Sequence, residues 1–91
     1  VDQVANFGLG SVYHDLKRYD EALPPLQTVV KEYKDYSAAY VLLGKTMEKL
    51  SRQDEAMQTY REGIAVASKK GDLMPLKEMQ QKLNQLLHSN P

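Results

Sequence analysis

The chain of 91 residues carries 12 basic and 12 acidic side chains, so its formal net charge is zero. This balance disfavours binding to nucleic acid or to an anionic membrane surface, since both need an excess of lysine and arginine. The absence of cysteine excludes disulfides, thiolate metal ligands and cysteine nucleophiles. The length suits one small domain with a modest core and little room for a deep enzyme cleft.

Apolar residues recur at helical spacing along the whole chain, and no segment shows the alternation of a strand. This pattern predicts five helices, near residues 3–16, 20–34, 37–50, 54–69 and 72–88. Short oxygen side chains stand just before four of these segments and are predicted N-caps: Asp20, Ser37, Asp54 and Asp72. Gly71 lies where the C-terminus of a helix favours a left-handed residue.

Two consecutive prolines, Pro24 and Pro25, fall four and five residues after Asp20. A proline inside a helix removes a backbone donor and clashes with the preceding turn. The cost is lower near the first turn, where the N–H groups have no intrahelical partner. We therefore expect a distorted or 3₁₀ start to the second helix, but not a broken helix.

A shift of 34 residues aligns the first part of the chain with the second without a gap. The shift superposes Ala5 on Ala39, Leu9 on Leu43, Gly10 on Gly44, Leu16 on Leu50, Arg18 on Arg52, and Asp20-Glu21-Ala22 on Asp54-Glu55-Ala56. The chain therefore holds two copies of one helix pair, followed by a fifth helix.

A repeat of 34 residues that contains two helices resembles the tetratricopeptide repeat (TPR). The first copy carries Leu9-Gly10-x₂-Tyr13, then Tyr19, then Ala22-x₃-Leu26; the second carries Tyr40-x₂-Leu43-Gly44-x₂-Met47, then Ala56-x₃-Tyr60. The resemblance implies an all-α fold, an α-solenoid of antiparallel helix pairs with a right-handed superhelical twist. It divides a single domain, 1–91, into repeat one (3–36), repeat two (37–70) and a capping helix (71–89).

Small residues in the repeat have a physical role. Gly10 and Gly44, with Ala22 and Ala56, are expected where the two helices of each pair cross, because a larger side chain would hold the helices apart. The first copy departs from the family at Asn6, where a large aromatic residue is usual, so its first turn is expected either to pack loosely or to rely on the neighbouring Phe7.

Residues with catalytic or metal-binding potential are scattered. His14 and Asp15 are neighbours on a helix and point about 100° apart, so they do not form one site. His88 is far away in sequence, and two separate histidines make a poor metal site. We expect no catalytic residue, no metal and no cofactor, and hence no enzymatic activity.

The first helix of each pair lines the concave side of a TPR array, so the resemblance implies a groove between residues 3–16 and 37–50. Helical spacing selects the residues opposite the face of Ala5, Leu9 and Tyr13. The predicted groove residues are Val4, Phe7, Ser11, His14, Val41, Leu42, Lys45 and Lys49. We expect this groove to bind a peptide or a partner domain, with Phe7 either an anchor for the partner or a replacement for the missing aromatic residue.

Two repeats make a short array, and such arrays generally need about three units. Because the chain begins with Val1, we expect it to be a piece of something longer. The alternative function is self-association into a homodimer, through the capping helix or an exposed face of a repeat. No apolar run approaches the roughly 20 residues that cross a membrane, so no membrane partner is expected.

Overall fold

The computed structural model describes residues 2–89, and within this range the chain forms five α-helices and no strand. They are α1 (Gln3–Asp15), α2 (Tyr19–Glu32), α3 (Ser37–Lys49), α4 (Gln53–Lys70) and α5 (Leu73–Ser89). The predicted all-α helical-repeat fold is confirmed, and the predicted helix bounds lie close to the observed ones.

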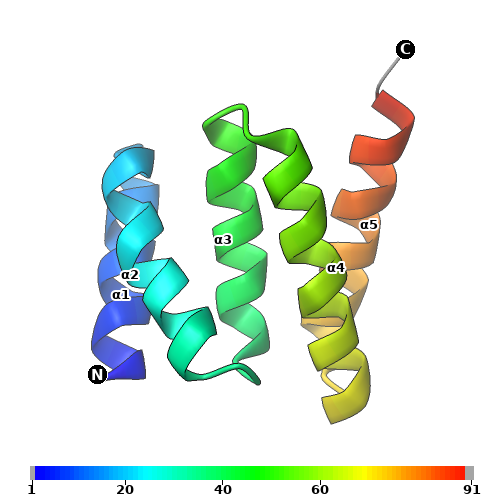
Figure 1. Ribbon diagram of the computed structural model, residues 1–91, viewed down its shortest axis with the longest axis horizontal. Helices are drawn as coiled ribbons and strands as arrows, with labels where there is room; N and C mark the ends of the chain where they lie inside the picture. Colours follow the sequence, from blue (N-terminus) through cyan, green and yellow to red (C-terminus); the bar gives the residue numbers. More distant parts are fainter. Residues whose placement is uncertain (1, 90–91) are drawn as a thin grey trace.

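The helices form two layers. α1, α3 and α5 make one layer, in which α3 touches both of the others, and α2 and α4 pack over it from one side (Figure 1). The Cα atoms span 38 × 29 × 18 Å, and the shortest dimension is that of two stacked helices. α1 and α5 lie at opposite ends of the long axis (Figure 1).

The core lies around α3 and α4, because each helix packs chiefly on its neighbours in sequence. α3 is covered on both sides, whereas α1 is an end helix whose only buried residue is Gly10. Ala5 and Leu9, on the face of α1 opposite the predicted groove, are exposed, because no helix covers this side of α1 within residues 2–89.

The two helices of each pair cross at a glycine, as predicted. A Cβ atom added to Gly10 would lie 2.5 Å from Cγ of Leu26, and one added to Gly44 would overlap the ring of Tyr60. Leu26 and Tyr60 are both fully buried. Only a residue without a side chain on the first helix therefore lets the second helix insert its large apolar residue.

A third glycine explains how α5 is seated. Gly63 in α4 takes the place that Val29 holds in the first repeat, and a Cβ atom there would meet the side chains of Met79 and Tyr40. Met79 is fully buried and is the main residue that α5 adds to the core. The departure from the repeat at Gly63 thus makes room for the capping helix.

The turns that end α1 and α3 place a residue other than glycine in the left-handed region. Lys17 (φ 62°) and Ser51 (φ 60°) occupy equivalent positions in the two repeats. In the first turn, the N–H of Arg18 donates to the carbonyl of Tyr13 (2.8 Å) and the N–H of Lys17 to that of His14 (3.0 Å). This is a Schellman motif, which usually contains glycine. Gly71 (φ 73°) has the predicted left-handed conformation at the end of α4.

Three of the predicted N-caps are wrong. Asp20, Ser37 and Asp54 lie inside their helices. The N-cap residues are Arg18, Tyr36 and Arg52, none of which caps its helix through a side-chain hydrogen bond. In both Schellman turns the N-cap residue directly follows the left-handed residue. α2 and α4 therefore begin one residue before Asp20 and Asp54. The aspartates still favour the positive end of the helix dipole from the first turn.

The two prolines do not distort the start of α2. The segment Tyr19–Glu32 is α-helical throughout, so the expected 3₁₀ start is wrong and the expected continuity of the helix is right. Pro25 is buried, whereas Pro24 is exposed and its carbonyl accepts from the hydroxyl of Thr28 (3.0 Å).

Gly44→Ala should lower the free energy of unfolding by about 1–3 kcal/mol, because the added methyl group overpacks the ring of Tyr60. Urea denaturation of the dilute protein measures this. Gly8→Ala is the matched control: a Cβ atom at Gly8 meets nothing within 4 Å. There the same change should raise the free energy of unfolding by about 0.5–1 kcal/mol. Equal effects at both glycines would contradict the close crossing.

Ser51→Gly should stabilise the chain by about 0.5–1 kcal/mol, because the left-handed conformation costs a residue with a Cβ atom about 1–2 kcal/mol and glycine loses part of that gain to chain entropy. Thermal denaturation followed by circular dichroism measures it. Ser51→Ala keeps the Cβ atom and should bring no such gain. A gain from Ser51→Ala equal to that from Ser51→Gly would show that backbone strain is not the cause.

Candidate functional site

Two cavities lie in line on the layer made by α1, α3 and α5. On each helix, a residue that lines the first cavity is followed three or four positions later by one that lines the second. These pairs are Ser11 and His14 on α1, Leu42 and Lys45 on α3, and Glu78 and Lys82 on α5. Three or four residues are about one helical turn. The cavities therefore form one groove that runs along the three helices, here called the groove.

The N-terminal half of the groove is apolar. Its volume is about 340 Å³, and its lining residues are Phe7, Ser11, Ala38, Val41, Leu42, Met74, Pro75 and Glu78. Phe7 stacks on Tyr36, with ring centroids 5.1 Å apart, so its ring is fixed against the turn before α3. Met74 is 84% exposed and lines the α5 side of this half.

The C-terminal half of the groove is basic. Its volume is about 360 Å³, and its lining residues are His14, Lys45, Glu48, Lys49 and Lys82. Glu48 accepts a hydrogen bond from the hydroxyl of the buried Tyr60, which positions its carboxylate. Within residues 2–89, Lys49 and Lys82 form no ion pair in the structure. The two unpaired ammonium groups of Lys49 and Lys82 face one engaged carboxylate, which makes this half attractive to an anionic group.

An ion pair joins the two halves. Lys45 on α3 pairs with Glu78 on α5, and the two side chains line different halves of the groove. Both are partly exposed, so the pair contributes little to stability by itself. Its main effect is to place one carboxylate and one ammonium between the apolar half and the free lysines.

His14 is tied to α3 by a buried hydroxyl. Its Nδ1 lies 2.9 Å from Oγ1 of Thr46, and that hydroxyl donates its only proton to the carbonyl of Leu42 (2.8 Å). Thr46 must therefore accept from His14, which places a proton on Nδ1. In the neutral imidazole, Nε2 is then left as an acceptor. The repeat could not predict this contact, because the position equivalent to Thr46 in repeat one is Val12, which has no hydroxyl group.

The surroundings of His14 favour its neutral form. Burial lowers the pKa of the imidazole below its ordinary value of 6.5, and the charges of Lys45 and Lys49 lower it further, whereas Asp15 opposes them. Burial also raises the pKa of the Tyr60 hydroxyl far above its usual range, with help from Glu48. Tyr60 is therefore a permanent donor to Glu48 at neutral pH.

The structure brings together seven of the eight residues predicted for the groove. Phe7, Ser11, Val41 and Leu42 line the apolar half, and His14, Lys45 and Lys49 line the basic half. Val4, in the first turn of α1, lines neither half and is 70% exposed.

Sequence reasoning missed the side of the groove that α5 supplies. Met74, Pro75, Glu78 and Lys82 line it, although the sequence predicted for this helix a capping role or a homodimer contact, and no part in the groove. The available signal was the equivalence of α5 with α1 and α3 as the first helix of a third unit.

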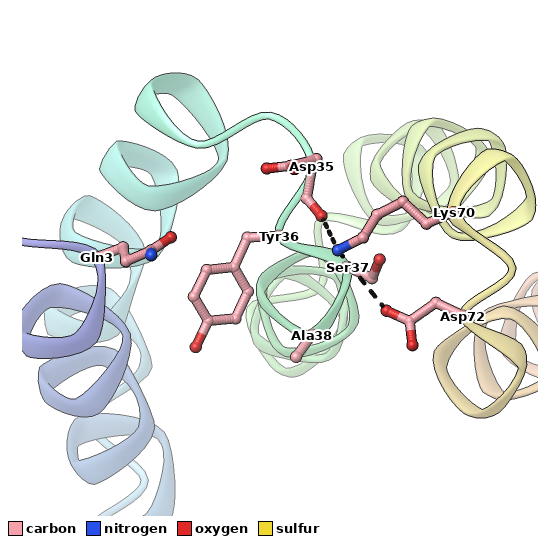
Figure 2. Close-up of a pocket in the computed structure, with 7 residues that line it drawn as sticks. All are labelled: Gln3, Asp35, Tyr36, Ser37, Ala38, Lys70 and Asp72. Carbon is pink, nitrogen blue, oxygen red and sulfur yellow. Dashed lines mark hydrogen bonds and ion pairs between the residues drawn. The ribbon is translucent and has the colours of Figure 1, made fainter.

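A third cavity lies where the two repeats meet, and its lining residues are Gln3, Asp35, Tyr36, Ser37, Ala38, Lys70 and Asp72 (Figure 2). Lys70 donates to the carbonyl of Asp35 (2.6 Å) and lies 4.0 Å from the carboxylate of Asp72. The hydroxyl of Ser37 is buried and has no hydrogen-bond partner among the described residues. Two carboxylates against one ammonium do not suit an anion. We interpret the contacts of Lys70 in this cavity as structural, because they hold the turn before α3 against the end of α4.

Two other kinds of site are absent from the described part of the chain. Residues 2–89 contain no group of three His, Cys, Asp or Glu side chains that could hold a metal ion. Within the same range, no helix has both the length and the apolar character needed to span a membrane.

His14 should titrate below pH 6.5 in NMR spectra of its ring protons. Since its pKa is lowered on folding, the unfolded chain binds more protons between the folded pKa and 6.5. The free energy of unfolding should therefore fall as the pH drops through that window, and His14→Gln should remove this dependence. Lys49→Gln should move the pKa of His14 upward. Titration at or above 6.5 would contradict the burial of His14 against Thr46.

Comparison with known proteins gives consistent matches. The pattern of the tetratricopeptide repeat matches residues 4–36 and again residues 37–70. A TPR repeat-containing protein of Pseudomonas aeruginosa is 37% identical over 73 residues, which are 80% of this chain and 70% of that protein.

Solved structures agree with these sequence matches. The crystal structure of a tetratricopeptide repeat domain protein from Salinibacter ruber superposes with a TM-score of 0.88 at 30% identity, covering 94% of this chain and 96% of that one. The solution structure of a protein from Bordetella parapertussis gives 0.87 at 31% identity, over 98% and 77% of the two chains. The chain therefore belongs to the tetratricopeptide repeat family, whose repeats generally serve as protein–protein interaction modules.

Proposed function

We propose that the chain is a non-catalytic interaction module whose groove binds a peptide or a partner helix with an apolar side chain next to an acidic group. The single observation that carries this proposal is the alignment of an apolar half and a basic half along α1, α3 and α5. An elongated, two-part groove suits a segment of protein chain better than a compact small molecule.

The spacing of the two halves limits the partner's sequence. Leu42 and Lys45 are three residues apart on α3, which is a rise of about 4.5 Å. A partner helix matches this distance with an apolar residue and an acidic residue one turn apart. An extended peptide matches it with residues one or two positions apart.

The charges of the groove support an acidic partner. Lys45 already shares its charge with Glu78, and Glu48 is held by Tyr60. The charges of Lys49 and Lys82 are therefore the ones that an incoming carboxylate can use. The carboxylate clamp, by which some TPR domains grip a C-terminal carboxylate through lysines and asparagines, is disfavoured, because its matching positions include Phe7, Ser11 and Leu42, none of the required type.

A second function, self-association, is favoured by one observation: Leu9, Val12 and Leu16 on α1 are exposed in a row. The other route to a homodimer, through the capping helix, has less support. Met79 and Leu86 of α5 are buried against the rest of the chain, and its exposed apolar residues, Leu73, Met74 and Leu87, lie at the two ends of the helix and form no continuous line.

Selection of peptides from a displayed random library against the 91-residue chain tests the proposed function. The selected peptides should share an apolar residue and an acidic residue at the spacing given above. For the best peptide, Met74→Glu and Lys49→Glu should each weaken binding by about tenfold or more. Met74→Glu puts a charge in the apolar half, and Lys49→Glu puts a negative charge in the half that is to bind the acidic group.

Leu87→Glu is the matched control, since Leu87 is exposed on α5 and lines neither half of the groove. It should leave the affinity unchanged, and circular dichroism should show all three variants folded. Selected peptides that bind both groove variants as tightly as the wild-type chain would place the binding surface elsewhere.

A further inference from the structure

We propose that the outer face of α1 is the contact surface of a homodimer, in which the α1 helices of two copies pack antiparallel to each other. The surface consists of Ala5, Leu9, Val12 and Leu16, here called the α1 stripe. This inference rests on self-association and not on peptide binding in the groove, so either can fail without the other.

The α1 stripe is an apolar surface with no cover in the structure. Leu9, Val12 and Leu16 are 46%, 54% and 59% exposed, and Ala5 is exposed as well. Steps of four, three and four residues place these side chains in one line along the helix, about 16 Å long. A line of this kind is the usual contact surface of one helix on another.

The second repeat shows what such a surface normally contacts. The residues equivalent to the α1 stripe are Ala39, Leu43, Thr46 and Leu50 on α3. Ala39, Leu43 and Thr46 are buried, and α3 packs on α1 and α2 of repeat one as well as on α4 and α5. In the stripe, Val12 replaces the polar Thr46 and makes the exposed surface the more apolar of the two. The α1 stripe is therefore built to receive a helix.

Gly8 lies beside the α1 stripe and has no structural reason within the described residues. A Cβ atom at Gly8 would meet nothing within 4 Å, whereas Gly10, Gly44 and Gly63 each lie under a side chain. Glycine inside a helix costs about 0.5–1 kcal/mol relative to alanine. The repeat does not require it either, because the equivalent residue is Leu42. A glycine here allows a second helix to approach α1 closely.

The order of residues on α1 makes a second copy the matching occupant. In an antiparallel pair, Leu9 meets Val12 of the second copy and Ala5 meets Leu16 of the second copy. Asp2 caps α1, since its Oδ1 accepts from the N–H groups of Val4 and Ala5. The antiparallel pair places the second oxygen of this carboxylate near Lys17 of the second copy, and twofold symmetry forms this pair twice. Lys17 is exposed and has no ion pair within residues 2–89. The opposed helix dipoles favour the same arrangement.

Sedimentation velocity of the 91-residue chain over a range of micromolar concentrations tests the proposal. The wild-type chain should shift from monomer to dimer as the concentration rises. Leu9→Glu and Val12→Glu should each weaken the dimer by about tenfold or more, because each buries an unpaired carboxylate at the centre of the contact. Both side chains are exposed in the monomer, so melting curves of the dilute variants should match that of the wild-type chain.

Leu87→Glu is the control for sedimentation, since Leu87 is exposed on α5 and should leave the dimer intact. A wild-type chain that stays monomeric at every concentration would overturn the proposal. So would a dimer that survives Leu9→Glu, or one that Leu87→Glu abolishes. Peptide binding by Leu9→Glu should equal that of the wild-type chain, which separates this surface from the groove.

Engineered cysteines test the orientation of the two copies, because the natural chain has no cysteine. Ala5→Cys mixed with Leu16→Cys should give a mixed disulfide under mild oxidation, since only the antiparallel pair brings these positions together. Ala5→Cys alone should crosslink poorly. Efficient crosslinking of Ala5→Cys to itself would indicate parallel helices and overturn the proposed arrangement.

Discussion

The close crossing of two helices within each pair is the contact on which the rest of the structure depends. At Gly44 the backbone of α3 lies against the ring of Tyr60, and at Gly10 the backbone of α1 lies against Leu26. These crossings fix how α2 and α4 sit on the other layer, and so leave α1, α3 and α5 side by side with one free face. The same contact reaches the groove, because the hydroxyl of Tyr60 extends past the crossing to hold Glu48. A core packing interaction therefore sets the position of a charged group in the groove.

The two repeats share their backbone but differ in what covers them. Repeat two is enclosed: Tyr40 is buried, and Gly63 admits Met79 of the capping helix. Repeat one has Asn6 in the place of Tyr40, and its aromatic contact comes from Phe7 stacked on Tyr36. The stacking places an aromatic ring at the edge of the groove instead of in the core. The departure at Asn6 thus leaves the aromatic contact of repeat one to Phe7, which stacks on Tyr36. The role of Phe7 as an anchor for a partner stays a prediction.

The fold could be predicted from the sequence because the 34-residue repeat shows that the same helix pair occurs twice. The shift that superposes Gly10 on Gly44 also predicts that both glycines lie at a helix crossing. The turns after α1 and α3 could not be predicted, because their left-handed positions hold Lys17 and Ser51 and not the glycine that usually marks such a position. For the candidate site, spacing within one helix correctly grouped Val41, Leu42 and Lys45 on one face. It could not place Lys82 or Met74, because the seat of α5 depends on packing between helices at Gly63. The pairing of His14 with Thr46 was hidden for the same reason.

The positions of the two proposed surfaces on α1 determine whether they can act together. Leu9 follows Phe7 by two residues, which is about 200° around the helix, so the α1 stripe and the groove lie on opposite sides of α1. A second copy on the stripe therefore leaves Phe7, Ser11 and His14 open to a partner. The neutral net charge also conceals an uneven distribution, with free lysines at the end of the groove and an acidic residue at the start of α1. Each surface thus has its own charge pattern, and a dimer built on the stripe would present two grooves to a bivalent partner.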